Sequence, residues 1–565
     1  MSDLKEKAES RSEGKMSSSA EVDVDAVMRQ LGQGGRFHLR AYVLVALVAV
    51  QVGLLHTTYI FLAADVPYRC MIPECEAWNT TEYSPAWLAG ALGGEGRERR
   101  CSSRAPAAAG ERASCGEGGF SDHLRPCDRW LYASHDTIVA EFNLACQEWK
   151  RTLVGTIHNI GMLVSLPILG YISDRWGRKR ALVLSCTLVG AIGSLKAFSI
   201  SYEMYVIVEF LETVAGASAF PAAYILTIEL LGQDKRVLTT AFLGIMLVIG
   251  GLSFALLAKT FAYWRTFILV VYPPSLLFLS YIYILPESIR WLLSKGRKEE
   301  AAEIVMSAAK MNKVTLSDET IKQLYTTEEK PKKDEKNISE EDGLWIQVLK
   351  SPIIMTRLAI CSWWWITCTF VFYGLAINSV SLAGDKYTNY MLVVSVEIIA
   401  VVTNAMVLDR FGRKRTLLTA YVVCGISCIS IAFVPSTLAW LATLLYLVGK
   451  IAITQAFSGI YMYTSELFPT HARHSLLGFC SMVGRVGSIV APQMPLLAIY
   501  VDWLPSVLFG ATALVAGALM MTTPETLNTR LPDTIAEAEH IEAASPADAP
   551  GKGTDHANGQ VTSRC

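Results

Sequence analysis

Charged side chains are scarce in this chain, and their scarcity argues against a soluble protein. Of its 565 residues only 18% are Asp, Glu, Lys or Arg, 52% are hydrophobic, and the mean hydropathy is +0.34. A soluble protein of this length could not bury so much apolar surface in cores of ordinary domain size. The formal net charge of −1 says little about partners, and no nucleic-acid partner is expected.

Signatures of enzymes and of nucleotide-driven pumps are missing as well. The motif G-x-x-x-x-G-K followed by Ser or Thr does not occur, which disfavours pumping driven by a nucleotide. No nucleophile–base set is apparent, so enzyme activity is not expected. Histidines such as His56 and His158 stand singly on apolar segments, where packing is the favoured role. No metal-ligand spacing is present, so neither a metal nor a cofactor is predicted, while a coupling ion such as sodium stays open.

Long hydrophobic segments are what the chain does have. Twelve segments of roughly 20 residues match the thickness of a bilayer core. Backbone groups in lipid must be hydrogen-bonded internally, so these segments are expected to be helices. They lie near residues 40–62, 152–172, 181–199, 204–229, 237–257, 264–285, 354–377, 388–408, 416–434, 439–463, 475–499 and 503–522. The polar residues 1–38 before them contain no evident signal peptide and are expected to be a disordered arm.

Three motifs recur in the same order and at nearly the same offset. The first is a basic loop that reads GYISDRWGRKR in one copy and AMVLDRFGRKR in the other. One motif of this kind arises easily by chance, but three in register indicate two homologous halves. The paired positions are 170–180 with 405–415, 224–230 with 463–467, and 286–288 with 524–526.

Basic residues in the short loops predict on which side of the membrane each loop lies. The short loops after the second, fourth, eighth and tenth segments carry eleven Lys and Arg residues, whereas the short loops on the other side carry only Lys259, Arg265 and Lys386. Cytoplasmic loops carry the excess of basic residues, so both termini are expected in the cytoplasm of a multi-pass plasma-membrane protein. The long loop 63–148 is then extracellular, because long loops translocate largely regardless of charge.

The extracellular loop is rich in cysteine. An even number of cysteines in one segment suggests three disulfides and an oxidising compartment, with a connectivity that the sequence leaves open. Asn79-Thr80-Thr81 in the same loop is a glycosylation acceptor, whereas Asn337 falls on the cytoplasmic side and should stay unmodified. Residues Ala89 to Gly119 are rich in Gly, Ala and Arg and are expected to be a flexible insertion. The disulfide candidates are Cys70, Cys75, Cys101, Cys115, Cys127 and Cys146.

The predicted fold is therefore an all-α integral membrane protein with twelve transmembrane helices in two pseudo-symmetric six-helix halves. A helical pattern is expected around Glu299 to Glu303 in the loop between the halves, and the C-terminal tail is expected to be unstructured. The parts are an N-terminal arm (1–38), an N-terminal half (39–285), a central cytoplasmic loop (286–352), a C-terminal half (353–523) and a cytoplasmic tail (524–565).

The six-plus-six helices, the repeated D-R-x-G-R-K-R loop and the long central loop resemble the major facilitator superfamily over roughly residues 40–530. The large cysteine-bearing loop and three motifs resemble the organic cation/anion/zwitterion transporter family; these motifs are PESIRWL (286–292), YTSELFPT (463–470) and LPDT (531–534). VGK (448–450) and GRVGS (484–488) look most like the organic cation/carnitine members. Ile289 stands where that family usually has proline, and the 89–119 insertion is unusual for it.

Three ionisable residues stand near the middle of predicted helices in the C-terminal half: Glu397, Lys450 and Arg485. An uncompensated charge at a helix centre costs about 2.5–3.5 kcal/mol, so such residues are expected to face a cavity or a partner. In the resembling family the position of Arg485 carries arginine in anion and carnitine transporters and an acidic residue in several cation transporters. Arginine binds a carboxylate through two parallel hydrogen bonds, although a salt bridge to Glu397 is the alternative.

Glu397 is predicted either to attract a cationic group or to balance Arg485 or Lys450. Lys450 is a weaker substrate candidate, for which a structural role is favoured, and Glu212 in the N-terminal half is weaker still. Phe372 and Tyr373 match family cavity aromatics that would suit a quaternary amine by cation–π contact. Trp364, from the run Trp363 to Trp365, is a further candidate. The alternative is ordinary packing for Phe372 and Tyr373, and an aromatic belt at the membrane interface for the tryptophans.

The repeated loops are predicted to gate the carrier. Asp174 is expected to accept hydrogen bonds from the next helix's N-terminus, and Arg178 to reach Glu229. Such cytoplasmic ion pairs would hold the outward-open state and break as the halves rock, unless the charges only set topology. The equivalent residues of the second half are Asp409, Arg413 and Glu466.

Taken with the resemblance, these residues predict a plasma-membrane secondary carrier of small organic cations or zwitterions that works by alternating access. A carnitine-like zwitterion fits best, because it needs both an anion partner and a cation partner. The rivals are an organic anion carrier, a sugar porter, which midplane charge disfavours, and a non-transporting membrane receptor or sensor.

Overall fold

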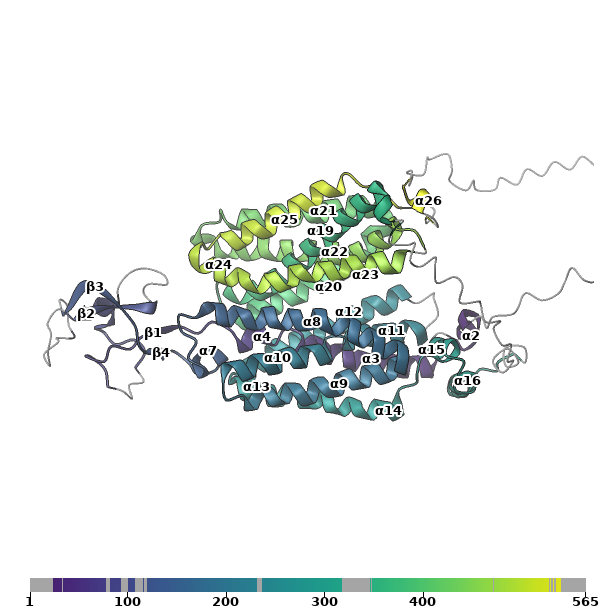
Figure 1. Ribbon diagram of the computed structural model, residues 1–565, viewed down its shortest axis with the longest axis horizontal. Helices are drawn as coiled ribbons and strands as arrows, with labels where there is room; N and C mark the ends of the chain where they lie inside the picture. The colour runs from purple at the N-terminus through teal and green to yellow at the C-terminus, as the bar shows by residue number, and fades with distance from the viewer. Residues whose placement is uncertain are drawn as a thin grey trace, which may run out of the picture.

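A computed structural model gives the three-dimensional arrangement of the chain. It describes residues 24–32, 34–77, 82–92, 100–106, 115, 119–230, 236–317, 346, 348–470, 472–527, 529, 532 and 535–539. Two helical bundles lie side by side, the N-terminal one in purple to teal and the C-terminal one in green to yellow (Figure 1). A small β-containing domain projects from one end of the N-terminal bundle, and short helices cover its other end (Figure 1).

The predicted fold class is confirmed. Among the described residues, eleven helical spans are long and apolar enough to cross a membrane, and a shorter apolar helix, Leu504–Met520, supplies the twelfth. The N-terminal half contains α3 (Arg36–Leu55), α4 (Tyr59–Leu62), α8 (Glu148–Trp176), α9 (Arg178–Leu195), η2 (Lys196–Phe198), α10 (Tyr202–Gly216), α11 (Ala219–Leu230), α12 (Arg236–Thr260), α13 (Trp264–Val271), η4 (Pro273–Ser280) and α14 (Tyr281–Ile284). The C-terminal half contains α19 (Pro352–Asn378), η6 (Ser379–Ser381), α20 (Lys386–Phe411), α21 (Arg413–Ile431), η7 (Ser436–Leu438), α22 (Ala439–Leu467), α23 (Arg473–Val490), η8 (Ala491–Gln493), α24 (Met494–Tyr500) and α25 (Leu504–Met520).

Local sequence signals start several of these helices. The side chain of Ser201 accepts a hydrogen bond from the backbone N–H of Met204 at the start of α10, and Asp385 accepts one from Thr388 at the start of α20. Ser351 caps α19 in the same way, directly before Pro352 at the first helical position. Such caps satisfy backbone donors that have no partner within the helix.

The repeated basic loops fit against the repeated Pro-Glu motifs. In the N-terminal half the carboxylate of Glu287 accepts a hydrogen bond from the backbone N–H of Lys179 at 2.9 Å, at the start of α9. In the C-terminal half Glu525 accepts from the backbone N–H of Arg413 at 2.8 Å, at the start of α21. A carboxylate at a helix N-terminus is favourable because the unpaired N–H groups and the helix dipole both attract negative charge.

Asp174 does not have the capping role that the sequence predicts. Its side chain is 74% exposed and forms an ion pair with Arg178 at 2.6 Å. Glu287 fills the position instead, because the chain after α14 returns to the start of α9. The sequence shows both motifs but not that they meet.

Replacing Gly177 with alanine should destabilise the protein, and the same holds for Gly412. Their φ angles are 108° and 98°, and an added Cβ would lie 2.3 Å from Glu287 and 2.6 Å from Glu525 respectively. Strain in such a conformation costs about 1–3 kcal/mol. We expect a lower thermal midpoint of the purified protein in detergent for either variant. Gly170→Ala is the matched control, since nothing lies within 4 Å of its added Cβ. An equal midpoint for Gly177→Ala and Gly170→Ala would contradict the argument.

The N-terminal arm is partly ordered, contrary to the expectation of disorder over residues 1–38. Helix α2 (Val24–Gln30) packs against α15 (Ile289–Ser294) and α16 (Lys298–Asn312) in one apolar cluster that includes Val27, Met28 and Leu31. The side chain of Asn312 bonds the backbone of Leu31 at 2.8 Å and of Phe37 at 2.9 Å. The arm folds because its apolar residues share one helix face that α16 covers. Residues 1–23 lie outside the described part.

The central loop and the tail are also partly structured. Helix α16 covers the stretch predicted to be helical. The tail was expected to be unstructured, yet α26 (Ile535–Glu539) packs on α19, where the guanidinium of Arg357 donates to the backbone oxygens of Ala538 and Glu539. Most of residues 318–347 and 541–565 lie outside the described part of the chain.

The projecting domain contains the three predicted disulfides, and the structure pairs Cys70 with Cys127, Cys75 with Cys115, and Cys101 with Cys146. Strand β1 (Tyr68–Cys70) pairs with β4 (Trp130–Tyr132), and β2 (Ser102–Pro106) with β3 (Phe120–Pro126), in antiparallel order. Short helices α5 (Leu88–Ala91) and α7 (Ile138–Glu141) complete it. The expectation that 89–119 is only a flexible insertion is therefore wrong for β2, which the neighbouring disulfides hold in place.

Glycosylation at Asn79 tests the predicted orientation, since Asn79 itself lies outside the described residues. We expect glycosidase treatment to shift the gel mobility of the wild-type protein from cells that glycosylate, and not that of Asn79→Gln. Asn337→Gln should behave as the wild type. A glycan that is lost only in Asn337→Gln would reverse the predicted topology.

Candidate functional site

The two halves touch toward the disulfide-bonded end. Gln493 of η8 exchanges hydrogen bonds with Thr152 (3.0 Å) and Thr156 (2.6 Å) of α8. Lys259 at the end of α12 pairs with Asp385 before α20 at 3.2 Å. Among the described residues, the hydrogen bonds and ion pairs between the halves all lie in this part of the bundle. The structure is therefore closed at the disulfide-bonded end.

The predicted gating pairs form, but within each half. Arg178 lies 3.3 Å from Glu229, joining α9 to α11, and Arg413 lies 3.4 Å from Glu466, joining α21 to α22. Both pairs are intact while the halves meet at the opposite end. The side chain of Asp409 is outside the described residues, and a gating role for the others stays a prediction.

Glu397 on α20 pairs with Lys450 on α22 rather than with Arg485. The ammonium of Lys450 lies 2.9 Å from the Glu397 carboxylate and 3.3 Å from the centre of the Phe372 ring. It also donates to the backbone oxygen of Phe372 at 3.2 Å. The protein's own cation thus occupies the position predicted for a substrate cation beside Glu397 and Phe372. Lys450 is fully buried, in keeping with the structural role that the sequence favours for it, and substrate contact by Lys450 stays a prediction.

Arg485 on α23 has no such partner. Its side chain is half-buried, and no ion pair joins it to a carboxylate among the described residues. It lies close enough to His56 of the N-terminal half and Tyr461 of α22 for electrostatic interaction with both. Gly484 and Gly487 beside it let α23 pack closely on α19: an added Cβ at Gly487 would lie 2.2 Å from the backbone oxygen of Ile366.

The predicted aromatic residues separate into two groups. Trp364 is fully buried, donates from Nε1 to the backbone oxygen of Ala516 at 3.0 Å and packs on Tyr463, and its substrate contact stays a prediction. Tyr373 instead points to the other half, where its hydroxyl lies 3.2 Å from Nε2 of His56. Phe372 is half-buried and packs on Phe457. Phe457 and Tyr461, which extend this surface on α22, had no distinguishing signal in the sequence.

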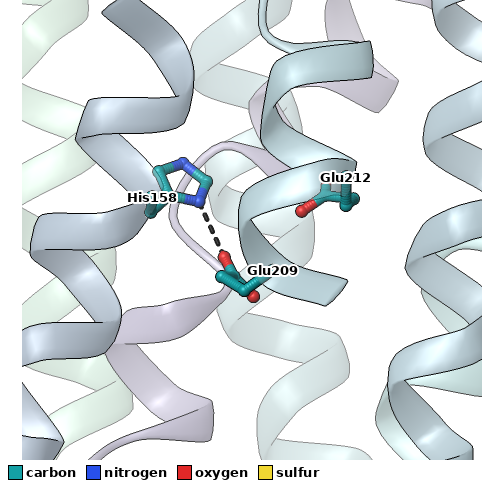
Figure 2. A group of neighbouring side chains, drawn as sticks. All are labelled: His158, Glu209 and Glu212. Carbon is teal, nitrogen blue, oxygen red and sulfur yellow. Dashed lines mark hydrogen bonds and ion pairs between the residues drawn. The ribbon is translucent and has the colours of Figure 1, made fainter. Parts of the chain in front are cut away.

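A buried charged cluster in the N-terminal half was missed. Lys196 of η2 lies 2.9 Å from Glu209 and 3.2 Å from Glu212, both on α10. His158 of α8 lies 2.7 Å from Glu209 (Figure 2). The sequence does contain a signal for such a cluster, because charged residues inside apolar membrane segments are costly unless they pair with one another. The sequence favours a packing role for His158 and gives Glu212 only a weak substrate role, because it does not show that the two residues become neighbours.

The carboxylates and imidazole of this cluster come within 4.8 Å of one another, which is close enough for a metal ion. The ammonium of Lys196 already contacts both carboxylates, however, and hydrogen-bonds to the hydroxyl of Tyr272 at 2.6 Å. A positive charge therefore occupies the place that a cation would take. The donor set does not fit a resident metal while Lys196 stays in position.

Comparisons with known proteins agree with this architecture. The family model described as "Major Facilitator Superfamily" matches residues 138–492. The "Organic cation transporter protein" of Drosophila melanogaster is 33% identical over 92% of this chain and 94% of its own length. "Organic cation/carnitine transporter 2" of Homo sapiens is 30% identical over 91% and 93%. A partially occluded inward-open structure of the xylose transporter XylE from E. coli superposes with a TM-score of 0.55 at 15% identity, over 87% of this chain and 98% of that one.

Proposed function

This chain belongs to the major facilitator superfamily and, within it, to the family of organic cation and carnitine transporters, and from that premise we propose that it carries a carnitine-like zwitterion or a related small organic cation. It does so across the plasma membrane by alternating access, with both termini in the cytoplasm. Its partners are the small-molecule substrate and the lipid bilayer.

Arg485 is the observation that carries this proposal. A half-buried guanidinium without a carboxylate partner, next to residues of both halves, is suited to bind a substrate carboxylate through two parallel hydrogen bonds. The aromatic surface of Phe372, Tyr373, Phe457 and Tyr461 supplies ring faces for the quaternary ammonium end. Glu397 acts at longer range, because Lys450 already neutralises it.

Alternating access uses the contacts between the halves. In the proposed cycle the hydrogen bonds of Gln493 to Thr152 and Thr156 form when the extracellular side closes, and they break when it opens. Each contact is a neutral side-chain hydrogen bond, which typically contributes only about 0.5–1.5 kcal/mol. Such weak contacts suit a closure that must open again in every cycle.

Uptake of labelled substrates into cells that express the chain tests the proposal. The panel contains a zwitterion, a simple organic cation, an organic anion and a sugar, each with sodium and with sodium replaced by lithium. The zwitterion is expected to be taken up best. Preference for the sugar, or no uptake of any compound with the protein at the cell surface, would overturn the proposal.

An organic anion carrier is the second candidate, and one observation favours it. Because Lys450 neutralises Glu397, Arg485 is left without an ion-pair partner among the described residues of the C-terminal half. An anion would satisfy Arg485 alone, and the uptake panel separates the two candidates directly. Coupling to an ion such as sodium stays open for both candidates, and the lithium arm of the panel reports it.

A further inference from the structure

The buried cluster of the N-terminal half is built around an ammonium with two carboxylates. Lys196 contacts Glu209 and Glu212 and has no exposed surface, and neither carboxylate side chain is more than 5% exposed. His158 joins the cluster through Nδ1, which lies 2.7 Å from Glu209 (Figure 2). The mechanism proposed above, with its substrate site on the C-terminal half, makes no use of these residues.

The charges of the cluster do not cancel when His158 is neutral. Two carboxylates and one ammonium sum to −1 when His158 is neutral, and to zero when His158 carries one more proton. Excess charge in the apolar interior of a membrane protein is costly, so the cluster favours a proton. A metal ion would neutralise it too, but Lys196 occupies the space between the carboxylates.

The geometry identifies the atom that takes the proton. Nδ1 of His158 donates its hydrogen to the Glu209 carboxylate, and Thr213 contacts the same nitrogen at 3.2 Å. A neutral imidazole that donates from Nδ1 has its lone pair on Nε2. Among the described residues no hydrogen bond reaches Nε2. The added proton therefore binds to the lone pair of Nε2, and no other bond changes.

A small cavity gives that ring access to water. Its volume is about 40 Å³, and its walls include His56, His158, Glu212, Thr213, Gln51 and Ser275. A cavity needs roughly 10–15 Å³ for each water, so two or three waters fit.

Other titratable groups surround the ring. Tyr59 lies 4.8 Å away and His56 6.2 Å away, measured between ring centres. On the side of α10 and η4, Tyr205 and Tyr272 face the Lys196–Glu209 pair. From the C-terminal half, Tyr373 bonds to His56, and Arg485 acts on His56 electrostatically. The cluster is thus connected through His56 to the contact between the halves.

We propose that His158, held by Glu209 in the cluster with Lys196 and Glu212, is a proton-binding site of the N-terminal half whose occupancy is linked to the movement of the halves. Proton binding stands on the cluster alone, whereas coupling to substrate rests on the proposed function.

Charge movement without substrate tests the site directly. Proteoliposomes with the purified full-length protein are adsorbed on a solid-supported membrane and exposed to an acidic pH jump. The wild type should give a transient current, and His158→Gln should lose it because the titrating ring is gone. Glu209→Gln should lose it as well, since the cluster is then neutral without a proton. His474→Gln, at an exposed histidine of α23, is the matched control and should keep the current.

Size-exclusion profiles and thermal midpoints identify any variant that fails to fold. If His158→Gln fails, Glu209→Gln serves in its place, because glutamine keeps the shape of the glutamate side chain. Equal transients in the wild type and a folded His158→Gln would overturn the proposal. So would a wild type that responds to a sodium jump at constant pH but not to protons. Because no substrate is present, failure of the proposed transport function would appear separately, in the uptake panel.

Discussion

Arg485→Ala is expected to reduce zwitterion uptake on the order of 30-fold or more while changing the uptake of a simple organic cation little, or raising it. Loss of one partner from a desolvated, hydrogen-bonded charge pair typically costs about 2–5 kcal/mol. Arg485 is half-buried and has no carboxylate of its own among the described residues, so the substrate carboxylate is the partner that is lost. A simple cation has no carboxylate and gains from removal of the positive charge.

The comparison needs two controls. Arg485→Lys retains the charge without the planar fork and should recover only part of the zwitterion uptake. Arg415→Ala removes an exposed arginine at the start of α21 and should leave the ratio of zwitterion to cation uptake unchanged. Initial uptake rates are normalised to the amount of protein at the cell surface. An equal loss of both substrates in Arg485→Ala would show that Arg485 has a structural role.

Lys450→Met is expected to produce the largest loss of stability. The substitution keeps a long side chain on the Phe372 ring but leaves the Glu397 carboxylate without the ammonium that lies 2.9 Å away. Removing one partner of a buried ion pair costs about 3–5 kcal/mol. The Glu397 side chain retains 18% exposure, so the lower end of that range is expected. The thermal midpoint of the purified protein in detergent measures the effect.

The double variant Lys450→Met/Glu397→Gln should recover most of the lost stability, because no buried charge then lacks a partner. The matched control is Lys259→Met, whose ion pair with Asp385 is exposed by 54% and 42%. Exposed pairs contribute about 0–1 kcal/mol, so the midpoint of this variant should move little. A double variant no more stable than Lys450→Met would contradict a pairing between Lys450 and Glu397.

The ion pair between Glu397 and Lys450 also changes how the effect of Glu397→Gln on uptake is interpreted. The sequence leaves two roles open for Glu397: it attracts the substrate cation, so that its loss would weaken uptake of both substrates, or it balances Arg485 or Lys450. In the structure the same substitution leaves the buried ammonium of Lys450 without its carboxylate. A fall in uptake by Glu397→Gln therefore has to be compared with its thermal midpoint before it is assigned to substrate binding.

The sequence by itself determined the membrane architecture. Segment length and hydropathy are local properties, and the requirement that backbone groups in lipid bond internally turns each long apolar segment into a helix. The repeat of the basic loops predicted two equivalent halves. The crowding of Cys70 to Cys146 into one polar loop predicted three disulfides, although not their pairing.

Only the tertiary structure decided which groups meet. Lys450 pairs with Glu397 rather than leaving it for Arg485, Glu287 rather than Asp174 caps α9, and Lys196 joins two carboxylates with His158. Each of these contacts depends on the rotation and packing of helices that are distant along the chain. A membrane helix that is apolar on all sides gives little indication of which face will turn toward its neighbours. The partner of a buried charge is therefore fixed by the assembled bundle, not by the segment that contains it.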